Sequence, residues 1–114
     1  SINRYIGSEI AYRNPDNPHL AAWSLENVLN KTNTNNYHPF IDVLAHSTLS
    51  KSQVDRILGY IREKPDDGKT PYLRWAIKSQ KGLTLTAEQQ KLLEGATYSY
   101  ECRQTGRSSY QCGG

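Results

Sequence analysis

The stretch SKSQVDRILGYIREK, residues 50–64, decides the fold. Ser50 followed three residues later by Gln53 is a capping box, in which the two side chains satisfy backbone N–H groups at a helix N-terminus. Apolar residues then recur at the i, i+3, i+4, i+7 spacing of one helical face, namely Val54, Ile57, Leu58 and Ile61. The stretch therefore predicts an amphipathic scaffold helix, which the turn at 65–68 ends.

Helix signals continue on both sides of this scaffold. Upstream, isoleucines spaced by four residues predict a first helix before the break at 14–18, and Pro18 and Pro39 each open a further helix. The inward residues expected of these two helices are Ala21, Leu25, Val28 and Leu29, then Phe40, Ile41, Val43 and Leu44. The polar segment 30–36 is predicted to be a loop.

Downstream, a helix over 71–81 ends at Gly82, and a second capping box, Thr86 with Gln89, opens a short helix that Gly95 stops. No strand alternation of useful length interrupts this series. The predicted fold is therefore all-α: a single small bundle of about six short helices with a cysteine-bearing C-terminal tail. We expect residues 1–114 to form one nucleic-acid-binding domain excised from a larger protein.

Composition narrows the partners. Fourteen Lys and Arg against eleven Asp and Glu leave a net charge of +3, which permits a polyanion partner without demanding one. No run of eighteen apolar residues is present, and the start SINRYIGSEI lacks the basic and apolar regions of a signal peptide. We therefore expect a soluble, cytoplasmic protein with no membrane partner.

The segment PYLRWAIKSQK, residues 71–81, separates into three faces on a helix that Thr70 is expected to cap. Leu73, Ala76 and Ile77 form an apolar stripe, and the basic stripe consists of Arg74, Lys78 and Lys81. Trp75 belongs to neither stripe. A tryptophan beside cations can stack on a base while the cations hold phosphates, so nucleic acid is the leading predicted partner. The alternative is that Trp75 packs against a neighbouring helix and the cations form a solvated face.

Further cations extend this prediction. Arg56 and Arg62 on the scaffold helix are expected to contribute to a positive rim, and Arg103 and Arg107 lie among tyrosines in the tail, which suits single-stranded bases and phosphates. In the alternative, the tail tyrosines pack against the bundle. A disulfide between Cys102 and Cys112 would order the tail and stabilise the fold by roughly 2 to 3 kcal/mol.

Catalytic and metal-binding patterns are missing from the sequence. The carboxylates form no alternating pair on a strand, the glycines are isolated, and no CxxC or HxxxH spacing occurs, so we assign no catalytic residue and no metal site. Two alternatives stay open. Segments 38–47 and 50–64 could form a helix-turn-helix regulator of duplex DNA that presents Lys51, Arg56 and Arg62. A small toxin-like ribonuclease could use His46, Lys51 and a tyrosine.

The order of these segments resembles a known family. The scaffold helix SKSQVDRILGYI, the basic helix PYLRWAIKSQK, the capped helix TAEQQKLLEG and the tail YSYECRQTGRSSYQCGG resemble the helix-bundle domain that follows the polymerase domain in archaeal plasmid primase-polymerases. The resemblance implies a noncatalytic accessory of primer initiation that binds single-stranded DNA template and nucleotide triphosphate such as ATP. It also implies a preceding polymerase domain in the same chain, which holds the metal-binding acids.

Overall fold

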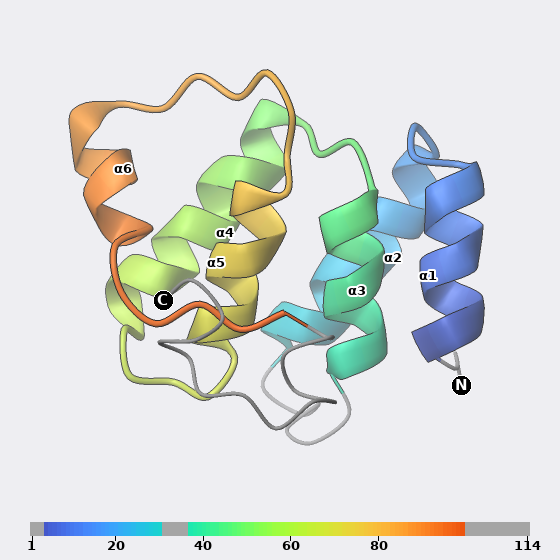
Figure 1. Cartoon of the computed structure of the whole chain (residues 1–114), viewed down its shortest axis with the longest axis horizontal. Coiled ribbons are helices and arrows are strands. Elements are labelled where there is room, and N and C mark those ends of the chain that lie inside the picture. The colour runs from blue at the N-terminus through green and yellow to red at the C-terminus, as the bar shows by residue number, and fades with distance from the viewer. Residues whose placement is uncertain (1–3, 31–36, 100–114) are drawn as a thin grey trace.

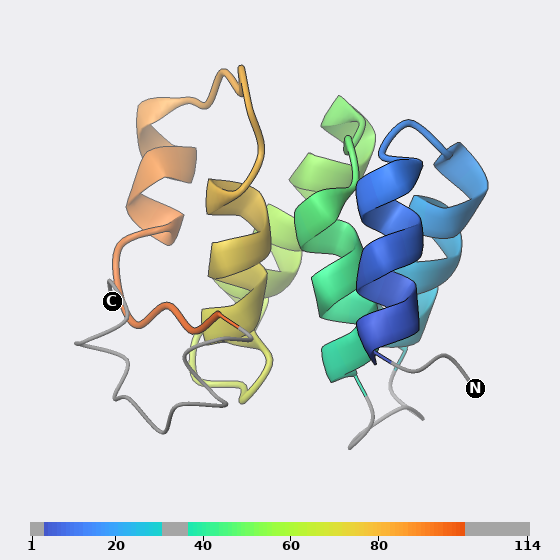
Figure 2. The ribbon, with the colours of Figure 1, turned by 45° about the vertical axis from the view of Figure 1, so that its right-hand side comes forward.

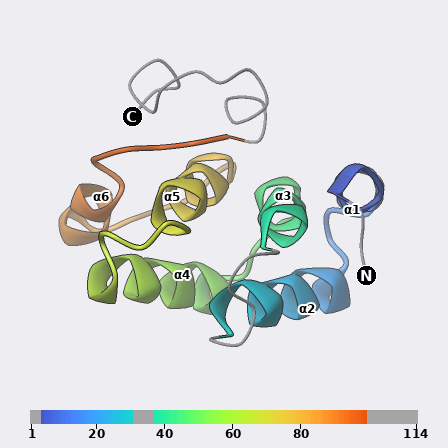
Figure 3. The same ribbon diagram turned by 90° about the horizontal axis from the view of Figure 1, so that it is seen from below.

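The computed structural model describes residues 4–30 and 37–99, in which every regular element is a helix. The six helices are α1 (Arg4–Arg13), α2 (Pro18–Leu29), α3 (His38–His46), α4 (Lys51–Glu63), α5 (Thr70–Lys78) and α6 (Ala87–Leu92). Seen from below, α1, α3, α5 and α6 form one layer, and α2 and α4 form a second layer on one side of it (Figure 3). The predicted all-α bundle is confirmed. Within the described part of the chain, no helix is both long and apolar enough to cross a membrane.

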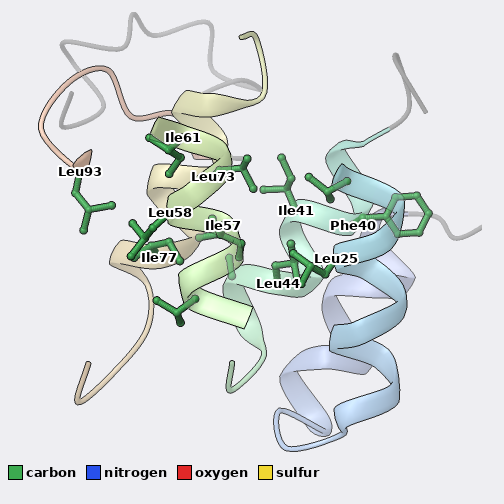
Figure 4. Close-up of a cluster of buried hydrophobic side chains, with 14 residues drawn as sticks. Leu25, Phe40, Ile41, Leu44, Ile57, Leu58, Ile61, Leu73, Ile77 and Leu93 are labelled. Atoms are coloured by element: carbon green, nitrogen blue, oxygen red, sulfur yellow. The ribbon is translucent and has the colours of Figure 1, made fainter. Parts of the chain in front are cut away.

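The core lies between the two layers. The scaffold stripe of α4 is fully buried, as predicted, and meets Leu73 and Ile77 of α5 and Leu93 after α6 (Figure 4). Leu25 of α2 and Ile41 and Leu44 of α3 complete the other side of the same cluster. Because one continuous cluster joins α2, α3, α4 and α5, these helices form a single packed unit.

Helix starts follow the sequence signals closely. Both capping boxes form, with Ser50 Oγ accepting from the Gln53 N–H at 3.1 Å and Thr86 Oγ1 accepting from the Gln89 N–H at 3.1 Å. Asn17 caps α2 by accepting from two backbone N–H groups, ahead of Pro18. Side chains that satisfy the first-turn donors thus fix these three helix starts.

The boundaries of α5 differ from the prediction. Thr70 does not cap the helix but belongs to its first turn, and its Oγ1 donates instead to the Lys64 carbonyl at 2.6 Å. The helix ends at Lys78 rather than at 81, because the Ser79 hydroxyl and the Gln80 amide bond to carbonyls of the last turn. Gly82, with a φ of +67°, lies beyond this end.

Gln80 also ties the end of α5 to the segment that joins α3 and α4. Its Oε1 accepts from the Leu49 N–H at 3.1 Å, and its Nε2 donates to the Leu44 carbonyl at 3.2 Å. On the far side of α3, α1 packs alongside it (Figure 2), with Ala11 buried while Ile10 stays 39% exposed. Because α1, α3 and α5 run in the same direction, their C-terminal ends lie at the same end of the bundle (Figure 1).

Candidate nucleic-acid interface

The three predicted faces of α5 meet three different surroundings. Leu73, Ala76 and Ile77 are all buried in the core, which confirms the apolar stripe. Arg74 and Lys78 bond to the segment after α6, whereas Trp75 faces the end of α3. The predicted basic stripe is therefore not one free surface, because two of its three cations bond to the chain itself.

Arg74 fastens the segment after α6 to α5. Its Nε donates to the Leu92 carbonyl and its Nη1 to the Ala96 carbonyl, each at 3.0 Å. Burial lowers the pKa of the Arg74 guanidinium from its ordinary value, although a guanidinium stays charged at neutral pH. A Cβ at Gly95, whose φ is +130°, would lie 3.1 Å from the guanidinium. Arg74 therefore holds the segment after α6 in place against α5.

Two further contacts continue this attachment. Lys78 Nζ donates to Thr97 Oγ1 at 3.0 Å, and the Tyr98 N–H donates to the Pro71 carbonyl at 3.0 Å. The Tyr98 ring stacks on Tyr72 with centroids 5.5 Å apart. For Tyr98, the alternative that tail tyrosines pack against the bundle is therefore the correct one.

A groove of about 710 Å³ opens where the ends of α1, α3 and α5 meet. This volume lies within the usual range for small-molecule sites. We call it the aromatic groove, and its described lining consists of Tyr12, Pro15, Ala45, His46, Ser47, Thr48, Leu49, Trp75, Ser79, Gln80, Lys81, Gly82 and Leu83.

Three aromatic rings line this groove in sequence. His46 lies between the other two, with its centroid 6.4 Å from that of Tyr12 and 6.3 Å from that of Trp75, both edge to face. Tyr12 is 76% exposed, and Trp75 packs one side against the rim of the core while its other side lines the groove. Trp75 thus packs against the core, as the alternative predicts, and stacking on a base stays a prediction.

Lys81 supplies the cation of the groove. It lies past the end of α5, is exposed, and makes no hydrogen bond or ion pair with the described residues. All three N–H groups of its ammonium are therefore available to an anion, whereas Lys78 shares one with Thr97 and Arg74 donates to two carbonyls. The early end of α5 brings this about, because residue 81 leaves the helical path that would have placed it in line with Lys78.

The backbone imposes a polarity on the groove. Three helix C-termini converge there, and each carries partial negative charge that disfavours an anion. Side chains bond to several backbone carbonyls near the ends of α3 and α5, among them those of Asp42, Val43 and Trp75. A neutral group thus suits the groove better than an anion does, except beside a cation such as Lys81, which offsets the negative helix ends.

The remaining predicted cations lie elsewhere. Arg56 Nη1 pairs with Glu26 at 2.6 Å and Arg62 Nε with Glu88 at 3.9 Å, both at exposed positions where ion pairs contribute little stability. Neither arginine lines the aromatic groove. Their contribution to a positive rim stays a prediction. Arg103, Arg107 and the Cys102–Cys112 disulfide fall outside the described residues.

A second hollow of about 410 Å³ is lined by residues to which the sequence assigns no binding role, including Tyr37, Tyr60 and Lys69. Lys69 is buried, and its Nζ donates to the Val28 carbonyl at 2.8 Å near the C-terminus of α2. Burial, with the neighbouring Asp67, raises the pKa of Tyr60 to about 12. These contacts explain Lys69 as a cation that stabilises a helix end.

The structure also bears on the two alternatives to single-strand binding, the helix-turn-helix regulator and the ribonuclease. α3 packs mainly on α1, α2 and α5, while α4 packs on α5, α6 and α2. Lys51 pairs with Asp55 on α4 at 2.9 Å and does not line the groove that holds His46. Among the described residues, no three His, Cys, Asp or Glu side chains gather as a metal site.

No family profile, curated protein or solved structure matches the chain.

We predict that Gly95→Ala destabilises the protein by more than about 1 kcal/mol, because the alanine would be strained at a positive φ and would press on Arg74. Gly59→Ala is the matched control. Gly59 lies within α4, and a methyl group there would meet no neighbouring atom within 4 Å, so alanine should stabilise by about 0.5–1 kcal/mol. Urea denaturation measures both variants, and a Gly95→Ala variant as stable as the wild type would contradict the tight fit of Gly95 against Arg74.

Proposed function

We propose that the protein binds single-stranded nucleic acid, with a base in the aromatic groove and a neighbouring phosphate on Lys81. The observation that carries this proposal is the aromatic groove itself, which the rings of Tyr12, His46 and Trp75 line. Its margin bears Lys81, a cation that makes no ion pair with the described residues. Exposed aromatic rings stack on bases of any sequence, and an adjacent ammonium attracts the backbone.

The groove favours a single strand over a duplex. A stacked base must leave its helix to reach a groove between three helix ends, which costs energy in a duplex but little in an already unpaired strand. The cations that a helix-turn-helix would present from α4 pair instead with carboxylates, Lys51 with Asp55 and Arg56 with Glu26. These pairs reduce the positive charge of α4.

The fuller proposal is that this domain serves primer initiation in a primase-polymerase. It would hold single-stranded DNA template, and nucleotide triphosphate such as ATP, for a polymerase domain that precedes it in the same chain. This rests on the resemblance of the helix order and on the groove, and we assign the domain no catalytic residue of its own. Arg74 and Lys78 are not carried into the proposed contact, because their side chains hold residues 92–97.

Trp75→Ala tests the stacking contact. Loss of one stacked base should weaken binding of a labelled oligothymidylate by roughly 1 to 3 kcal/mol, measured by fluorescence anisotropy. Trp23→Ala is the matched control, because Trp23 is 46% exposed on α2 and does not line the groove. Equal losses in both variants would contradict the assignment. Cleavage of an RNA oligonucleotide by the wild type would instead favour the ribonuclease.

Lys81→Ala tests the phosphate contact. Removing one contact should lower the slope of log affinity against log salt by about 0.7 for a single strand. Lys78→Ala serves as the control, since this lysine has the same charge three residues away but bonds to Thr97. The slope of the control should stay close to that of the wild type. A larger change for Lys78 than for Lys81 would move the phosphate to the opposite face of α5.

A further inference from the structure

One hydrogen bond fixes which nitrogen of the His46 ring is left for a ligand. The Nδ1 atom lies 2.8 Å from the Asp42 carbonyl oxygen, which can only accept, so Nδ1 carries a hydrogen whether the ring is neutral or charged. The Nε2 atom is therefore the one that faces a ligand, as a lone pair in the neutral ring and as an N–H in the charged ring. Within the described part of the chain, no hydrogen bond to Nε2 occurs, and the side chain is 35% exposed where it lines the aromatic groove.

Negative charge lies on two sides of the His46 ring. The buried Asp42 carboxylate has an oxygen 3.6 Å from Nδ1, and the ring lies in the last turn of α3, where the helix dipole attracts positive charge. The other groups that face the groove are Tyr12 from α1, Trp75 from α5, and Lys81, which opposes a second cation. An anion between His46 and Lys81 would relieve that repulsion.

We propose that His46 is the second phosphate contact of the aromatic groove, and that it acts only when protonated. This inference rests on the proposed function. Protonated His46 donates its Nε2–H to a phosphate oxygen beside Lys81, whereas the neutral ring presents a lone pair that cannot. Histidine changes charge between about pH 5 and pH 8, so single-strand affinity should rise as the pH falls through this interval.

The test measures binding of a labelled oligothymidylate of about twelve nucleotides at about pH 5.5 and about pH 8. Neither thymine nor a phosphodiester titrates in this interval, so any change arises from the protein. Wild-type affinity should be roughly three- to tenfold higher at the lower pH, as one additional charge-assisted contact at a partly exposed site would give. The effect should weaken in high salt.

His46→Asn is the diagnostic variant. Asparagine can donate to the carbonyl four residues earlier, as Asn14 does to Ile10 and Asn27 to Trp23, so it keeps the bond of Nδ1 and removes Nε2. It should lose the pH dependence, so that its affinity at about pH 5.5 equals its affinity at about pH 8. If circular dichroism shows that this variant is unfolded, His46→Gln replaces it. His19→Asn removes an exposed histidine outside the groove and should behave as the wild type.

The outcomes separate the two proposals. If the wild type binds no oligothymidylate at either pH, the proposed function fails. If it binds with the same affinity at both, or if His46→Asn keeps the full pH dependence, the function stands and the role of His46 is refuted. Loss of affinity in His46→Asn at about pH 8, with the pH dependence unchanged, would likewise refute it, because the ring would then act only by packing.

Discussion

Burial of Leu73, Ala76 and Ile77 fixes the rotation of α5 about its own axis, and the rest of the surface depends on that rotation. With the apolar face held against α4 and α3, Arg74 must point toward α6 and Trp75 toward the end of α3. A helix turned by one residue would lose both arrangements, since adjacent residues differ by about 100°. The core therefore determines which cations reach solvent.

The same constraint gives the cations of α5 and of the segment just after it different surroundings. Arg74 and Lys78 hold residues 92–97, a segment that contributes only Leu93 and Thr97 to the buried set and depends on polar contacts for its position. Lys81 bonds to none of the described residues, and it is the cation to which we assign the phosphate in the proposed function. Since three helix C-termini converge on the groove, a bound strand would place its base inward and its phosphate at the margin.

The fold could be predicted from the sequence, but the aromatic groove could not. Capping boxes and apolar stripes act over three to seven residues, so the starts of α4 and α6 and the buried face of α4 could be predicted. The third face of α5 was also predictable, because Trp75 is off both stripes. Nothing local brings Tyr12, His46 and Trp75 together, since their approach depends on how three helices pack. The end of α5 depended likewise on Gln80 bonding to Leu49, a contact across 31 residues.

The central claim is that a single strand occupies the aromatic groove, and the two tryptophans of the chain allow one direct measurement of it. Their indole N–H signals can be followed by two-dimensional ¹H–¹⁵N NMR while an oligothymidylate is added. Trp75 lines the groove and Trp23 lies on α2 against Phe40, with ring centroids 5.1 Å apart. We expect the Trp75 signal to move progressively and saturate while the Trp23 signal stays in place. Movement of Trp23 alone, or of neither signal despite measured binding, would contradict it.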